Sequence, residues 1–200
     1  MFKIAVLISG TGTTLHSILK DAARDDLYEV ALVIADRSCS GLNFAKESGI
    51  PFLIMERNAS LSDDILERVQ ELDLVVLAGF LSILDGRILK VMENKVINLH
   101  PSLLPEFGGR GMYGLNVHKA VFESGMPISG CTVHYVNEII DGGGYILKRI
   151  IGIRNAEGPE EIMHLVSEIE KGALIDAIRL IAKEDKNYES TDQCIRQNRA

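Results

Sequence analysis

Uninterrupted apolar runs recur along the first part of the chain, over residues 4–8, 30–35 and 74–78, each bounded by glycine or polar residues. Two further short strands are expected, one over residues 51–54 and one over residues 96–99, which includes Asn98. Runs without polar alternation are typical of strands that are covered on both faces of a parallel sheet. Between them, apolar residues at helical spacing predict helices over 15–24, 42–48, 60–69 and 88–92. This alternation predicts an α/β fold with a doubly wound, mostly parallel central sheet and helices on both faces.

The pattern changes after residue 100. Residues 128–136 alternate, which predicts a strand with Thr132 and His134 on one face and Cys131 and Val133 on the other. A further strand is expected over residues 145–151, after a run of three glycines that begins at Gly142.

Two helices are expected among these later segments. Asn116 is expected to cap a helix that carries His118 on its surface, and Pro159 to open a long amphipathic helix that continues through Ile181. No repeat, low-complexity segment or linker interrupts the chain, so we expect one domain over residues 1–183 and a polar tail over 184–200.

Composition narrows the functional class. The chain is 46% hydrophobic and 24% charged, as in globular proteins, and its net charge of -7 gives no general attraction for nucleic acid or an anionic membrane. No apolar run approaches the length of a membrane span, and residues 2–8 are too short for a signal peptide. Cys39, Cys131 and Cys194 are odd in number and widely spaced, which indicates free thiols and a cytoplasmic location.

A small-residue turn follows the first apolar run. The sequence Gly12-Thr13-Thr14 lies between that strand and the next helix, where free backbone N–H groups and the helix dipole favour a bound phosphate. The glycines could instead only form the turn. A dinucleotide-binding turn is a further alternative, with Asp36 as the acid that binds the ribose, but Leu15 stands where that motif needs a small residue.

Asn98 and His100 lie two positions apart on a predicted strand, so they point to the same face. An amide donor beside an imidazole can polarise a carbonyl group and transfer protons. Asp141, before the glycines, could orient the imidazole if the chain folds back. Both strand residues could equally satisfy backbone groups at a strand end. The histidines lack metal-ligand spacing, and no GxSxG motif marks a nucleophilic serine.

Four segments together resemble the folate-dependent formyltransferase family. They are Ile8-Ser9-Gly10-Thr11-Gly12, Leu77-Ala78-Gly79-Phe80, Asn98-Leu99-His100-Pro101-Ser102-Leu103-Leu104-Pro105 and Asp141-Gly142-Gly143, in the family's order. The short turn near the N-terminus is similar to that of the branch that acts on glycinamide ribonucleotide.

The resemblance implies transfer of the formyl group from 10-formyltetrahydrofolate to the amine of 5'-phosphoribosylglycinamide, without a metal, in purine biosynthesis. It implies that Asn98 donates to the oxyanion of a tetrahedral intermediate, that His100 is the general acid, and that Asp141 stabilises the protonated ring and orients it. It assigns the ribonucleotide to Gly12, Thr13, Thr14 and Glu170, and the folate to Arg57, Leu81, Ser82, Ile83, Leu84, Asn98, Asn137, Glu138, Ile139, Ile140 and Asp141.

The chain also departs from the family pattern. Ser82 stands where many members have arginine, Thr14 replaces a common asparagine, and the glycine-rich segment 108–114 is longer than in many members. Arg57 is the candidate for an arginine expected after the third strand.

Three other functions are alternatives to glycinamide ribonucleotide formylation. A formyltetrahydrofolate hydrolase would use the same three residues but usually has an additional N-terminal domain, and an initiator-tRNA transformylase would need a basic RNA-binding face. A non-catalytic nucleotide-binding protein would have no use for the Asn98 and His100 pair. The expected partners are therefore small-molecule substrates, with no nucleic acid or membrane, in a monomer or weak homodimer.

Overall fold

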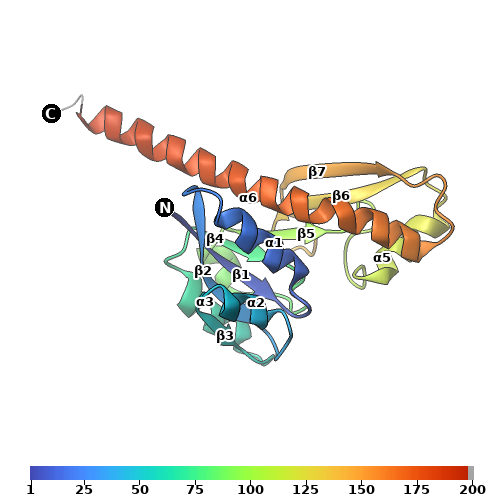
Figure 1. Ribbon diagram of the computed structural model, residues 1–200, viewed down its shortest axis with the longest axis horizontal. Coiled ribbons are helices and arrows are strands. Elements are labelled where there is room, and N and C mark those ends of the chain that lie inside the picture. The colour runs from blue at the N-terminus through green and yellow to red at the C-terminus, as the bar shows by residue number, and fades with distance from the viewer. Residues whose placement is uncertain (198–200) are drawn as a thin grey trace.

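A central sheet of seven strands organises the protein (Figure 1). The computed structural model describes the backbone of residues 1–197 and the side chains of residues 1–187. The strand order is β3-β2-β1-β4-β5-β6-β7. The strands are β1 (Phe2–Ile8), β2 (Tyr28–Ala35), β3 (Phe52–Ile54), β4 (Leu74–Leu77), β5 (Val96–His100), β6 (Ile128–Tyr135) and β7 (Tyr145–Gly152). Strands β1 to β5 are parallel and the last two are antiparallel, which confirms the predicted α/β class.

Helices cover both faces of this sheet. They are α1 (Thr13–Ala22), α2 (Leu42–Glu47), α3 (Leu61–Val69), α4 (Arg87–Val91), α5 (Leu115–Glu123) and α6 (Pro159–Gln197). One hydrophobic core lies between the sheet and α1, α2, α5 and α6, and the other lies between the sheet and α3 and α4. Alternate residues of β1 enter opposite cores, Ile4 and Val6 the first and Ala5 and Leu7 the second. This double burial explains why the run is apolar at every position.

Two local predictions about α5 are wrong. The helix begins at Leu115 after Gly114, whose positive φ of 53° suits glycine, so Asn116 lies inside the helix and its amide donates to the Gly111 carbonyl. His118 is buried rather than on the surface, because α5 packs its face with Val117 into the first core. Burial lowers the pKa of His118, and the charge of His100 adds to this effect.

The last helix is longer than its apolar pattern predicts. It continues from Pro159 to Gln197 and passes the expected boundary at residue 183, so that its final turns project from the body of the molecule (Figure 1). Residues 198–200 of the expected tail lie outside the described residues. Arg179 anchors the helix to α1 through Asp21, with Nη1 and Oδ2 3.0 Å apart. In the described part of the chain, no helix combines the length and hydropathy required to cross a membrane.

Candidate active site

The loops after β1 and β4 meet at the carboxyl edge of the sheet. The Ser9 amide donates to the Gly79 carbonyl over 3.2 Å, and the Leu81 amide donates to the Ser9 hydroxyl over 2.8 Å. Parallel neighbouring strands end at the same edge, so these contacts follow from the pairing of β1 with β4. The small-residue turn and the 81–84 segment are therefore adjacent.

The turn before α1 depends on a close approach between two glycines. Gly12 has a φ of 72°, and a Cβ added to it would lie 2.5 Å from the Cα atom of Gly41. Thr13 and Thr14 then form the start of α1. The N–H groups of this first turn have no partners within the helix, and the helix dipole makes the position favourable for an anion. No sequence signal identified Gly41 as the partner of this turn.

Asn98, His100 and Asp141 are brought together at the end of β5, and His134 of β6 joins them. Nδ1 of His100 lies 3.5 Å from Oδ2 of Asp141, and Nε2 of His134 lies 3.6 Å from Oδ1 of the same carboxylate. The amide nitrogen of Asn98 lies 3.3 Å from Nε2 of His134. The carboxylate thus lies between two buried imidazoles, with the Asn98 amide beside the second.

Local backbone geometry places Asp141 in this position. Its φ of 56° is in the left-handed region, and a Cβ on Gly142 would lie 2.6 Å from the side chain of Ile139. A Cβ on Gly143 would overlap the Tyr135 carbonyl oxygen. The Gly109 amide, from the glycine-rich 108–114 segment, donates to Oδ2 of Asp141 over 2.8 Å. Both glycine-rich segments therefore hold the carboxylate, a role that the sequence did not reveal for 108–114.

Both nitrogens of His100 face acceptors. Nε2 lies 2.8 Å from the Phe107 carbonyl oxygen, and Nδ1 faces the Asp141 carboxylate. A carbonyl and a carboxylate both accept hydrogen bonds, so each neighbour suits an imidazole that donates. Donation of a proton is the role of a general acid.

His134 has the opposite environment. Its Nδ1 lies 2.8 Å from the Tyr135 carbonyl oxygen, so Nδ1 carries the proton and Nε2 is free to accept from Asn98. Burial lowers the pKa of His134, which favours this neutral form. The contact fixes the Asn98 amide and leaves its second N–H available. Sequence alternation placed His134 on the face of Thr132, but only the β5–β6 register places it opposite Asn98.

The segments expected to bind folate expose apolar side chains. Leu81 and Ile83 follow β4, Ile139 and Ile140 follow β6, and all four are exposed, whereas Leu84 is buried in the second core. Exposed apolar side chains on two loops beside a polar cluster are typical of a ligand-binding surface.

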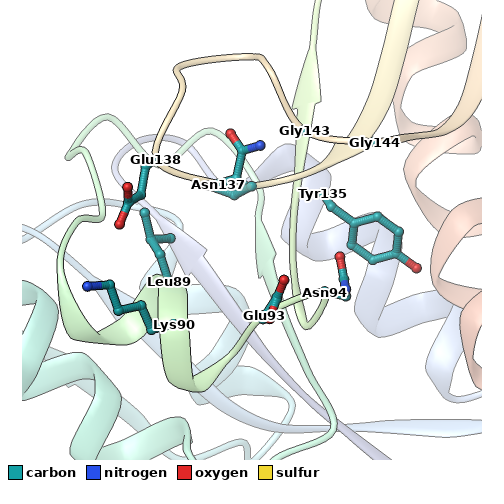
Figure 2. Close-up of a pocket in the computed structure, with 10 residues that line it drawn as sticks. Leu89, Lys90, Glu93, Asn94, Tyr135, Asn137, Glu138, Gly143 and Gly144 are labelled. Atoms are coloured by element: carbon teal, nitrogen blue, oxygen red, sulfur yellow. The ribbon is translucent and has the colours of Figure 1, made fainter.

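A cavity of about 340 Å³ lies between α4 and the loop that follows β6. Figure 2 shows Asn137 and Glu138 on the loop side of this cavity and Leu89 and Lys90 on the helix side. Its remaining lining residues are Glu93, Asn94, Tyr135, Val136, Gly143 and Gly144. Two of the residues expected to bind folate, Asn137 and Glu138, line this cavity, whereas residues 81–84 do not.

Two of the expected folate-binding side chains contact Asp36 instead of pointing away from the protein. The Ser82 hydroxyl donates to Oδ2 of Asp36 over 2.6 Å, and Nε of Arg57 lies 2.9 Å from the same oxygen. Asp36 is thereby accounted for without a ribose, which removes the observation that favoured a dinucleotide-binding turn.

Glu170 is half-buried on α6 rather than on an exposed face. Burial raises the pKa of Glu170, and the positive charge of Lys171, which lowers this pKa, has the smaller effect. Burial, followed by the charge of Glu170, raises the pKa of Cys131 to about 12. Among the described side chains, no group of three or more histidines, cysteines and acidic residues is arranged to hold a metal ion.

The fold and this site define a formyl transferase. The family model described as "Formyl transferase" matches residues 2–178, and the chain belongs to this family. It is 37% identical to the phosphoribosylglycinamide formyltransferase of Haemophilus influenzae, over 81% of this chain and 78% of that one. The crystal structure of glycinamide ribonucleotide transformylase 1 from Symbiobacterium toebii is similar, with a TM-score of 0.84 and 34% identity over 92% of this chain and 89% of that one.

A longer relative contains the same region as a part. The chain is 36% identical to the trifunctional purine biosynthetic protein adenosine-3 of Gallus gallus over 90% of its own length, but it spans 18% of that relative.

Proposed function

We propose that the protein transfers the formyl group of 10-formyltetrahydrofolate to the amine of 5'-phosphoribosylglycinamide, a step of purine biosynthesis. The observation that carries this proposal is the cluster at the end of β5, in which Asp141 contacts His100 and His134 and Asn98 contacts His134, on the sheet edge that also holds the turn before α1. Relatives with that name support the choice of substrates.

The chemistry requires a tetrahedral intermediate. The ribonucleotide amine attacks the formyl carbon, and the carbonyl oxygen gains charge that the free N–H of Asn98 stabilises. His100 donates its proton to N10 of the folate, with Asp141 stabilising the charged ring before this transfer. The bond between the formyl carbon and N10 breaks as the intermediate collapses, and the proton lost by the attacking amine restores the proton of His100. The products are tetrahydrofolate and the formylated ribonucleotide.

The remaining assignments are part of the same proposal. Gly12, Thr13 and Thr14 hold the phosphate, Glu170 contacts the polar part of the ribonucleotide, and segments 81–84 and 137–141 enclose the folate with Arg57 nearby. The chain acts in the cytoplasm on small molecules, as a monomer or weak homodimer. The unpaired thiols of Cys39 and Cys131 suit a reducing compartment.

The direct test measures loss of the formyl group from 10-formyltetrahydrofolate, with and without glycinamide ribonucleotide. The proposal expects loss only when the ribonucleotide is present, with one formylated product for each tetrahydrofolate. Equal loss in its absence would identify a hydrolase that uses the same residues with water as acceptor. No loss in either case would contradict both functions.

Replacing Thr13 and Thr14 with alanine is expected to raise the KM for the ribonucleotide by about tenfold, because each hydroxyl lost removes a charge-assisted hydrogen bond to phosphate. The KM for the folate should stay near its wild-type value. Steady-state kinetics with each substrate varied in turn measure both constants. Ser17→Ala is the matched control, since its hydroxyl is one turn further along α1 and donates to the Thr13 carbonyl. An equal rise for both substrates would count against the phosphate assignment.

Asp141→Asn is expected to lower kcat and to change the pH–kcat profile. The Asp141 carboxylate lies 3.5 Å from Nδ1 of His100, and an asparagine there would have no charge to interact with the ring. The measurement is kcat across a pH series. Asp73→Asn is the control, because Asp73 accepts from the Lys3 amide at the opposite edge of the sheet. A profile identical to that of the wild type would remove the proposed coupling to His100.

A further inference from the structure

A second buried carboxylate lies at the carboxyl edge of the sheet, outside the catalytic cluster. Asp36 follows β2 directly and is 2% exposed. Its carboxylate accepts hydrogen bonds from Ser82, Arg57 and Arg37, the last with Nε 3.0 Å from Oδ1. These partners come from three segments that are distant in sequence. Asp36 is therefore a junction between the loops that follow β2, β3 and β4.

Hydrogen bonds near Asp36 also hold the backbone of residues 81–84. The Ser9 hydroxyl accepts from the Leu81 amide over 2.8 Å, and Ser9 is also one of the groups that lower the pKa of Asp36. The next residue, Ser82, donates its hydroxyl directly to the carboxylate. Two consecutive residues of the segment are thus held, one through its amide and one through its side chain. Leu81 and Ile83 remain exposed on either side of the anchored Ser82.

The charge on Asp36 is needed for this arrangement. Burial raises the pKa of the carboxyl group, but hydrogen bonds from Arg37, Ser82, Ser9 and Arg57 outweigh burial and hold the pKa well below its ordinary value. A charged acceptor forms stronger hydrogen bonds than a neutral one. An asparagine in its place would lose the charge and present N–H groups to partners that are themselves donors.

We propose that Asp36 is a positioning residue, which holds the backbone of residues 81–84 in the conformation that binds the formyl donor. The proposal rests on the proposed function, because that function assigns the segment to the folate. Asp36 itself is too deeply buried to contact a ligand, so it acts through Ser82. Its loss should weaken donor binding and leave the ribonucleotide site and the acid–base cluster unchanged.

Asp21 provides a matched control with the same chemistry. It is buried like Asp36, and its carboxylate accepts from the Tyr28 hydroxyl and from Arg179, each over 3.0 Å. These partners join α1, β2 and α6, away from the 81–84 segment. Asp21→Asn therefore reproduces the cost of removing a buried, paired charge without touching the donor segment.

The experiment compares Asp36→Asn, Asp21→Asn and Ser82→Ala in two measurements. Steady-state kinetics should show the KM for 10-formyltetrahydrofolate rising by about tenfold in Asp36→Asn, equivalent to about 1.4 kcal/mol, and in the same direction in Ser82→Ala. The KM for the ribonucleotide should change by less than about twofold. Hydrogen exchange at the Leu81 amide should be faster in Asp36→Asn and unchanged in Asp21→Asn.

The outcomes show whether Asp36 positions residues 81–84 or only stabilises the fold. If Asp36→Asn and Asp21→Asn lose thermal stability alike and keep the donor KM of the wild type, the positioning role is wrong. Ser82→Ala removes one hydroxyl near the surface, so it decides the question if Asp36→Asn does not fold, and an unchanged donor KM in that variant would overturn the inference. A wild-type chain without formyl transfer would refute the proposed function, whereas unchanged Leu81 exchange in Asp36→Asn would refute the positioning by itself.

Discussion

Replacing His100 with alanine is expected to lower kcat for formyl transfer by about 10²- to 10⁴-fold, the range for removal of a positioned general acid. The ring faces the Asp141 carboxylate and the Phe107 carbonyl, and alanine can make neither contact. Affinity for the ribonucleotide should be nearly unchanged, because the phosphate assignment involves the turn before α1. Rapid-mixing kinetics for kcat and calorimetry for binding separate the two effects.

His164→Ala is the control for this experiment. His164 lies on the exposed face of α6, with 74% of its side chain exposed, so its loss should leave kcat at the wild-type value. A His100→Ala variant that folds and keeps near-normal turnover would show that the acid is elsewhere.

Asn98→Ala is expected to lower kcat by about 10²- to 10³-fold, with a small change in either KM, as found when one donor to an oxyanion is removed. The Nε2 atom of His134 accepts one N–H of the amide and thereby directs the other. The affected interaction forms only in the transition state, so the loss should appear in kcat. Steady-state kinetics at saturating concentrations of both substrates measure it.

Asn116→Ala is the matched control, because its amide donates to the Gly111 carbonyl at an exposed position. A similar fall in kcat for both asparagines would indicate a general loss of structure. If Asn98→Ala instead raised the KM for both substrates and kept kcat, the amide would bind the ground state and have no role in stabilising the oxyanion.

The fold could be predicted because each strand carried its own evidence. The run over residues 4–8 is apolar at every position, and both of its faces are indeed buried in separate cores. The alternating strand over 128–136 was also found, as β6. The predictions that failed concern single positions. The Asn116 cap was wrong because Gly114 begins the turn into α5, and the surface position of His118 was wrong because α5 packs that side chain inward.

The candidate site was predictable only in part. Asn98 and His100 share a face because strands have a period of two, a local property. The contact with Asp141 depends on the chain's return through β6 and the following loop. The Phe107 carbonyl and the Gly109 amide carried no signal, because any residue supplies these backbone groups.

By itself, the sequence determined which residue types are available at the end of each strand, and which of them are consecutive or alternate. These are local properties, set by steric preference and by the period of each element. Only the tertiary structure decided that His134 is opposite Asn98, that Gly41 packs on Gly12, and that Asp36 anchors the 81–84 segment. Those contacts depend on strand order and register, which are set by packing of the whole sheet and by no single segment.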